Sequence, residues 1–325
     1  MIELVKKLMF APGVSGRESK ICEVIKKEVE PYCDEVTVDA VGNLVAHKKG
    51  SGKKIMFGAH MDEIGYFATY ITDKGLIKIS PIGGINYLSS TFATVVSERG
   101  VCGLLAPNKS DELPNTDNVY IDIGAKTKKQ AEARVKVGDF FVHTPSLKRL
   151  IGTRYIGRPF DDRIGCAVLI EALKNVKNTD NDLYFVFTVQ EEVGSRGARP
   201  ATYQIAPDVA IAVDVTKTDD KPGSDLLNIK IGSGATVKIK DGSVICSVEL
   251  VEKMRELAKE GKVKYQNEML SGGGTDTSVM QITGRGAMAG AISIPCAFIH
   301  TCNEMIDIND AKEAVKLAVL IAERI

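Results

Sequence analysis

Short apolar runs separated by polar, turn-forming segments recur along the chain and predict β-strands. The runs from Lys54 to Ala59, Leu183 to Val189 and Val209 to Val215 are continuous and β-rich, which is typical of strands buried on both faces of a sheet. Apolar positions at helical spacing predict helices from Arg163 to Asn175 and from Val248 to Glu260. This alternation predicts an α/β domain with a mostly parallel sheet.

The N-terminal segment predicts a helix followed by two short strands. Helical apolar spacing covers Ser19 to Glu30, and Ser15 is a candidate N-cap for that helix. Strand-like runs then follow around Val36 and Leu44. These elements extend the predicted α/β domain to the beginning of the chain.

Between Gly65 and about Gly152 the pattern changes to short strand-like pieces separated by Gly, Asn, Asp and Pro turns. Little there is helical beyond Lys128 to Arg134. The pieces run from Tyr66 to Thr72, Thr91 to Ser97, Val101 to Leu105 and Asp139 to His143. The sequence therefore predicts a small β-rich, barrel-like domain at residues 66–153, inserted into an α/β domain made of residues 1–65 and 154–325.

Composition narrows the classes of function. Basic and acidic residues both number 42, so no excess of positive charge indicates binding to nucleic acid or to an anionic membrane. Neither a leader-like apolar segment nor a membrane-spanning run is found, which predicts an unexported, cytoplasmic protein. The seven cysteines are scattered without a CxxC pair, as is typical of reduced thiols.

Five segments each place an acid or a histidine at the end of a predicted strand or in the loop after it. In an open α/β sheet this edge is where ligands bind. The segments are AHMDEIG (59–65), RPFDDRIG (158–165), VQEEVGSRGA (189–198), AVDV (212–215) and FIHT (298–301).

The acid within the apolar run VAIAVDV changes the interpretation of all five segments. An unpaired charge at Asp214 would be expensive to bury, so a cation is expected beside it. Two imidazoles and three carboxylates are available, a mixture that suits zinc, cobalt or manganese. They are His60, Asp161, Glu192, Asp214 and His300. If Asp161 bridges, these residues form two three-ligand sites with open positions, which indicates catalysis.

The motifs HMDEIG, FDDRIG, QEEVGSRGA, AVDV and IHTCNEMID resemble, in order and spacing, those of family forty-two of the metallopeptidases. That family contains the tetrahedral and glutamyl aminopeptidases, and some relatives carry the label endoglucanase. The similarity covers nearly the whole chain, including SGRES (15–19) and SGGGTD (271–276). It implies a zinc-exopeptidase-like catalytic domain that hydrolyses N-terminal residues from short peptides.

The resemblance also implies a role for each site residue. His60 and Asp214 would bind one metal ion, Glu192 and His300 the other, and Asp161 would bridge the two. Glu191 would be the general base that activates a water shared by two zinc or cobalt ions, with manganese possible. Because the choice of Asp161 over Asp162 rests on the family pattern alone, the sequence leaves the pair as one candidate site.

Further predictions concern the supporting residues. Glu191 and Glu192 can both serve the site only if the backbone turns, which Gly194 and Gly197 permit. Asp62 can accept a hydrogen bond from the second nitrogen of His60.

Four more positions complete the predictions, two beside the site and two outside it. The resemblance places Asp276 near the pocket, toward the substrate amino group, and Arg163 is expected to fix the Asp161 loop. His47 and His143 match none of the catalytic segments and are interpreted as ordinary residues.

Two departures from the family pattern leave substrate preference open. PCAF precedes FIHT where the family often has an Arg-Tyr pair, and Arg158 stands where lysine is common. The closest alternative is a deacylase or another amidohydrolase with the same two-metal chemistry. A metal-independent glycosidase acting through two carboxylates and a non-catalytic scaffold are the remaining alternatives. The resemblance further implies dimers, formed through the inserted domain, that assemble into a dodecamer.

Overall fold

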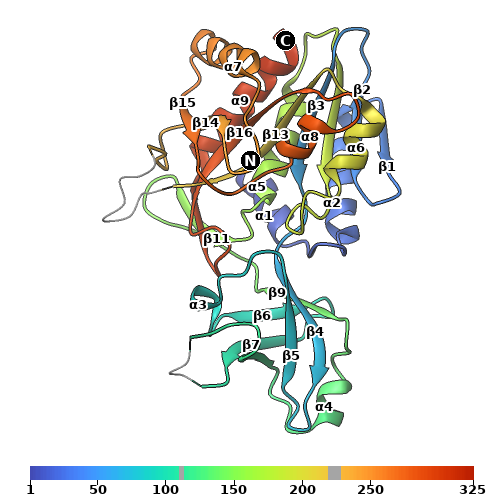
Figure 1. Cartoon of the computed structure of the whole chain (residues 1–325), viewed down its shortest axis with the longest axis vertical. Coiled ribbons are helices and arrows are strands. Elements are labelled where there is room, and N and C mark those ends of the chain that lie inside the picture. Colours follow the sequence, from blue (N-terminus) through green and yellow to red (C-terminus); the bar gives the residue numbers. More distant parts are fainter. Residues whose placement is uncertain (110–112, 219–227) are drawn as a thin grey trace.

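A computed structural model describes residues 1–109, 113–218 and 228–325 and shows two units, a large α/β unit and a small β-barrel (Figure 1). The barrel projects from one end of the large unit, and both chain termini belong to the large unit. Within the described residues, no helix combines the length and apolar character needed to cross a membrane. All seven cysteines are free, which confirms the prediction of unpaired thiols.

The large unit is built on a mixed sheet whose four central strands, β12, β3, β13 and β16, are parallel. The strands flanking this centre are antiparallel, with β2 and β1 on one side and β17, β11 and β10 on the other. The prediction of a parallel sheet is thus confirmed for its centre. Its strands are β1 (Glu35–Val38), β2 (Leu44–Lys48), β3 (Lys54–His60), β10 (Ser146–Arg149), β11 (Arg154–Arg158), β12 (Asp182–Thr188), β13 (Val209–Lys217), β14 (Ala235–Lys240), β15 (Tyr265–Met269), β16 (Met288–Ala297) and β17 (Glu304–Asp307).

Helices cover both faces of this sheet and form two separate hydrophobic clusters with it. One face carries α1, α2, α5, α7 and α9, and the other carries α6 and α8. Phe57 of β3 and Phe185 of β12 stack at 5.3 Å in the larger cluster, and burying each ring contributes about 1.5–3 kcal/mol. The helices are α1 (Ile2–Met9), α2 (Ser19–Val29), α5 (Arg163–Asn175), α6 (Ala198–Ile205), α7 (Val248–Glu260), α8 (Thr277–Ile282) and α9 (Ile308–Arg324), with a 3₁₀ turn η1 (Glu30–Tyr32).

The small unit is a closed six-stranded barrel with its own core, which includes Tyr66, Leu105 and Phe141. Its strands are β4 (Gly65–Ile71), β5 (Ile77–Ile82), β6 (Thr94–Ser97), β7 (Cys102–Pro107), β8 (Val119–Asp122) and β9 (Phe140–His143), and its helices are α3 (Tyr87–Ser90) and α4 (Lys128–Glu132). Residues 146–149, which we assigned to the insertion, form β10 and pair with β11 of the large sheet.

The start of α2 differs from the prediction in one respect. The helix begins at Ser19, but Glu18 occupies the N-cap position and Ser15 does not cap it. The Ser15 hydroxyl instead donates a 2.6 Å hydrogen bond to Asp62. The prediction of an N-cap was wrong because a local pattern does not disclose a partner 47 residues away.

Candidate metal centre

Five side chains from five separate segments converge at the C-terminal edge of the parallel strands. His60 is the last residue of β3, and Asp214 lies near the end of the adjacent strand β13. Asp161 follows β11, Glu192 follows β12, and His300 follows β16. The sheet topology therefore assembles the site from the segments that the sequence singled out.

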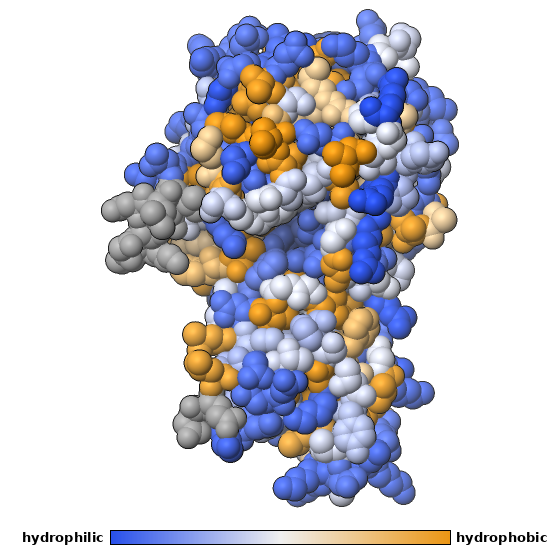
Figure 2. Space-filling view, in the orientation of Figure 1, coloured by the Kyte–Doolittle hydropathy of each residue, from blue (hydrophilic) through white to orange (hydrophobic). Residues whose placement is uncertain are grey.

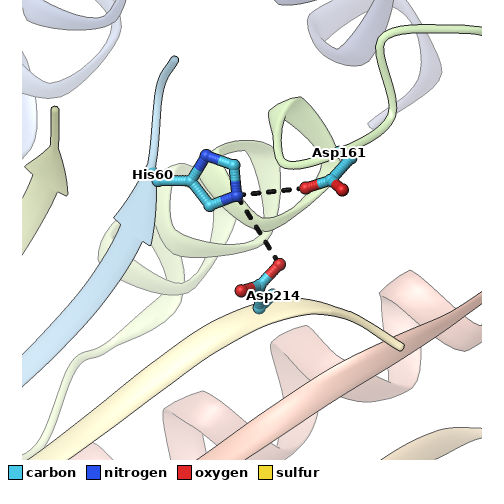
Figure 3. A group of neighbouring side chains, drawn as sticks. All are labelled: His60, Asp161 and Asp214. Atoms are coloured by element: carbon cyan, nitrogen blue, oxygen red, sulfur yellow. Dashed lines mark hydrogen bonds and ion pairs between the residues drawn. The ribbon is translucent and has the colours of Figure 1, made fainter. Parts of the chain in front are cut away.

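The five side chains form two groups that share Asp161. In the first, the His60 Nε2 atom lies 3.0 Å from Asp161 Oδ1 and 3.7 Å from Asp214 Oδ1 (Figure 3). In the second, the His300 Nε2 atom lies 3.3 Å from Asp161 Oδ2 and 3.1 Å from Glu192 Oε2. One oxygen of Asp161 thus faces each histidine. Within each group the candidate ligand atoms all lie within 4.8 Å of one another.

Asp161 and Asp162, which the sequence did not distinguish, have different surroundings in the structure. The Asp162 carboxylate accepts a 3.0 Å hydrogen bond from the Gly165 N–H and caps α5. Asp161 is the member that faces both histidines. The same pair of acids thus supplies a helix cap and a candidate bridging ligand.

The backbone does turn after β12, as two neighbouring acids at one site require. Gln190, Gly194 and Ser195 all have positive φ, at 55°, 112° and 50°. Gly197 is glycine for another reason, because an added Cβ would lie 2.3 Å from Asn43 Oδ1. The prediction of a turn is confirmed, and Gly197 both allows close packing and closes the turn, because its N–H donates to the Val189 carbonyl oxygen at 3.0 Å. Inside the turn, the Ser195 hydroxyl donates to Glu191 Oε1 at 3.2 Å.

Asp62 contacts more of the site than the sequence indicated. Its Oδ1 atom lies 3.3 Å from His60 Nδ1, and the same ring nitrogen lies 3.2 Å from the Asp62 carbonyl oxygen. The carboxylate also accepts hydrogen bonds from the backbone N–H groups of Glu191 and Glu192, at 3.0 and 3.2 Å. One buried carboxylate therefore orients the His60 ring and the backbone of both glutamates.

The prediction for Arg163 was wrong. Its guanidinium donates to the Glu63 carboxylate and to the carbonyl oxygens of Leu8, Ala11 and Gly13, and so anchors the N-terminal segment. The Asp161 segment is held by Glu304 instead, which accepts from the N–H groups of Phe160 and Asp161 at 2.6 and 3.2 Å. Sequence reasoning missed Glu304, although it lies within the motif IHTCNEMID, because nothing local marks it as buried.

The pKa values indicate a strongly negative site. Burial raises the pKa of Asp214 to about 8, although His60 opposes the shift. Burial disfavours the charged form of His300, but hydrogen bonds to Asp161 and Glu192 outweigh it and raise the pKa to about 11. The same hydrogen bonds, with those from His60, hold the pKa of Asp161 below its usual range despite burial. Protons held by Asp214 and His300 thus offset part of the negative charge that a bound cation would otherwise neutralise.

The residues present fit two divalent cations. Three carboxylates and two imidazoles form the mixed set of ligands that zinc, cobalt and manganese accept. Glu192 Oε1 is buried and has no hydrogen-bond partner within the described part of the chain, so an acceptor is available there. With Glu191, the three ligand carboxylates carry four negative charges when ionised, which two divalent cations balance.

A cavity of about 800 Å³ opens over the two groups and is lined by both units. The barrel contributes residues 84–88 and Leu113–Pro114, and the large unit contributes residues 272–275 together with the site itself. Figure 2 shows the surface hollowed between the two units, with mainly hydrophilic side chains in the hollow. The cavity is large enough for a short peptide end.

Asp276 lies behind this cavity. Its carboxylate accepts a 2.6 Å hydrogen bond from the Thr188 hydroxyl, and its neighbour Thr275 lines the cavity while Asp276 does not. Burial raises the pKa of Asp276 to about 6. A role toward the substrate amino group stays a prediction.

The remaining two histidines lie outside both ligand groups, as predicted. His47 contacts Asp182 at 2.6 Å and stacks on Tyr184. His143 lies in the barrel, where its Nε2 atom is 3.3 Å from the Tyr66 hydroxyl.

Comparisons with known proteins place these observations in a family. The profile of the M42 glutamyl aminopeptidases matches residues 42–317. A putative aminopeptidase of Acetivibrio thermocellus is 44% identical over 98% of this chain and 97% of its own. An aminopeptidase structure from Desulfurococcus kamchatkensis has a TM-score of 0.97 at 35% identity, covering 100% of this chain and 94% of that one. The TET1 peptidase of Pyrococcus horikoshii has a TM-score of 0.89 at 33% identity, covering 100% of this chain and 99% of that one.

The family profile spans more than half of the chain, and the curated relative matches it almost from end to end. The chain therefore belongs to the M42 glutamyl aminopeptidases, a family of metallopeptidases, and is an aminopeptidase.

Proposed function

We propose that this aminopeptidase removes N-terminal residues from short peptides at a site that holds two divalent metal ions, with Glu191 as the general base. The observation that carries the proposal is the position of Asp161, which presents one carboxylate oxygen to His60 and the other to His300. A carboxylate placed in this way can bridge two ions.

The ligands divide as the resemblance implies. His60 and Asp214 would hold one ion, Glu192 and His300 the other, and Asp161 both. The ions, zinc or cobalt with manganese as a third choice, would act as Lewis acids toward the scissile carbonyl and lower the pKa of an attacking water.

Glu191 is the proposed carrier of the proton. Its side chain lines the cavity, and the Ser195 hydroxyl holds one of its carboxylate oxygens. Burial raises the pKa of Glu191, and the negative charges of Asp276, Asp214 and Glu192 add to the shift although His60 opposes it. A carboxylate with a raised pKa can take a proton from water and return it to the leaving amine. Asp276 would act on the substrate amino group through its charge.

The test is metal removal and restoration with a matched pair of peptides. A chelated enzyme should lose release of the N-terminal amino acid from a free peptide, and zinc or cobalt at two ions per chain should restore it. Activity that survives exhaustive chelation would refute the proposal. The N-acetylated form of the same peptide serves as the comparison, because a deacylase would prefer it.

The deacylase or another amidohydrolase remains the alternative, because the two-metal chemistry suits any well-placed amide. A metal-independent glycosidase is not favoured. Its two carboxylates would flank a sugar ring about 5–10 Å apart, whereas here the acids contact histidines at 3.0–3.7 Å.

We further propose that the chain forms homo-oligomers, with dimers joined through the barrel and assembled into a dodecamer. In support, the similar TET1 peptidase of P. horikoshii can assemble into a tetrahedron or a large octahedral shell. A cytoplasmic location is also proposed, because seven free thiols suit a reducing compartment.

A further inference from the structure

A buried arginine lies beneath the His300 side of the site. Arg158 ends β11 and is 1% exposed. Its Nη1 atom donates to Glu304 Oε1 at 2.8 Å and to the carbonyl oxygen of Thr301 at 2.6 Å. Thr301 directly follows His300, so the arginine holds the segment that carries this histidine.

The partner of Arg158 holds the other segment. The second oxygen of Glu304 accepts from the N–H groups of Phe160 and Asp161. The ion pair therefore ties the segment that carries Asp161 to the segment that carries His300. His60 and Asp214 depend on it less, because strands β3 and β13 position them directly.

The His300 segment needs such support. Phe298 and His300 both have φ near +60°, at 63° and 62°, a conformation that costs about 1–3 kcal/mol for a residue other than glycine. The His300 side chain is also 33% exposed, whereas that of His60 is 2% exposed. Packing therefore restrains the first histidine more than the second.

The hydrogen bonds of Arg158 would favour cation binding by holding the ligand segments, whereas its positive charge would oppose it. Burial lowers the pKa of the Arg158 guanidinium, but the surrounding acids outweigh burial and raise this pKa. These acids include Glu304, Glu63, Glu192 and Asp161. Two of these are candidate metal ligands, so the fixed positive charge repels a cation on the His300 side. Positioning and repulsion predict opposite results when the arginine is removed, and the sign of the change in affinity separates them.

We propose that Arg158, paired with Glu304, is a positioning residue for the second metal ion, the one held by Asp161, Glu192 and His300. The inference rests on the proposed two-metal function. The hydrogen bonds of Arg158 to Thr301 and Glu304 hold the segments of His300 and Asp161 close enough for both side chains to contact one ion. This positioning outweighs the repulsion between the arginine's charge and the ion.

The experiment is a calorimetric titration of the metal-free enzyme with Zn²⁺. In Arg158→Met, one of the two binding steps should weaken about 10–100-fold, the usual effect of losing a residue that orients ligands. The variant His300→Ala should weaken the step that belongs to the His300 side, and so shows which of the two zinc-binding steps that is. Arg158→Lys should recover part of the affinity, because its ammonium keeps a charged donor near the same oxygens.

Arg163→Met is the matched control, because Arg163 is equally buried and paired with Glu63 but contacts the N-terminal segment. It should lower the Tm without weakening the His300 step selectively. If Arg158→Met does not fold, Glu304→Gln makes the same test from the other side of the pair and should weaken the same step.

The outcomes separate the inference from the proposed function. A parent enzyme that binds a single zinc ion refutes the two-metal function, and the inference falls with it. A parent that binds two, with Arg158→Met unchanged, tighter at the second step or weakened equally at both, overturns the inference alone.

Discussion

Replacing Asp62 with asparagine tests whether one carboxylate organises the site. The Asp62 carboxylate contacts four groups, which are the His60 ring, the Ser15 hydroxyl and the N–H groups of Glu191 and Glu192. Burial raises its pKa, but His60, Ser15 and the Glu191 N–H outweigh burial and lower it. The fold thus favours the ionised form, and its loss should be destabilising.

The magnitude follows from the number of contacts. Asparagine offers one oxygen where aspartate offers two, so about two of the four donors lose their acceptor. At about 1.5–3 kcal/mol for each hydrogen bond to a charged group, the free energy of unfolding of the metal-free chain should fall by about 3 kcal/mol or more. Zinc affinity at the His60 step should fall about 10–100-fold, because the ring is no longer held.

Denaturant unfolding and zinc calorimetry measure the two effects on one preparation. Asp182→Asn is the matched control, because the Asp182 carboxylate also contacts an imidazole, a hydroxyl and a backbone N–H, those of His47, Tyr184 and Gly50, but lies at the end of β12 remote from the site. It should lose stability and keep its zinc affinity. Stability and zinc affinity equal to the parent's in Asp62→Asn would refute the reasoning, as would a comparable loss of zinc affinity in Asp182→Asn.

Three further predictions concern the site. Glu191→Gln should lower kcat by about 10²–10⁴-fold at unchanged metal content, because the base is lost while the ligands remain; a kcat near the parent value would exclude Glu191 as the base. The pKa values of Asp214 (about 8) and His300 (about 11) are raised in the metal-free site, so a cation must displace protons and its affinity should rise as the pH increases through about 8. Calorimetry in buffers of different ionisation enthalpy counts those protons, and binding without proton release would contradict this. Gly84→Ala should weaken zinc binding at the His300 step with little change in Tm, because the new Cβ would lie 3.1 Å from His300 Nδ1; unchanged affinity would show that the ring adjusts freely.

The segments that carry His60, Glu192 and Asp214 could be predicted because each ends or directly follows an apolar run that the sequence marks as a strand. Asp214 was informative in itself, since it interrupts such a run. Asp161 could not be separated from Asp162 without the structure, because the assignment depends on the start of α5, where Asp162 accepts a hydrogen bond from Gly165.

Long-range partners were the features that sequence patterns did not disclose. Ser15 resembled a helix cap and Arg163 resembled a loop anchor, but both contact groups far away in the chain. The antiparallel edges of the sheet were hidden for the same reason, because short apolar runs carry no information on strand direction. Glu304 is the clearest case, since only the tertiary fold buries it against Phe160.

The barrel lines one side of the cavity with residues 84–88, opposite the two candidate ligand groups. The Cys302 thiol also donates to the Ser89 carbonyl oxygen across this junction. An enzyme from which the barrel is removed would therefore lack residues 84–88 of the cavity lining. The segment that carries His300 and Cys302 would also lose its contact with Ser89. For protein engineers, the barrel supplies part of the lining of the cavity over the candidate site and should be kept together with it.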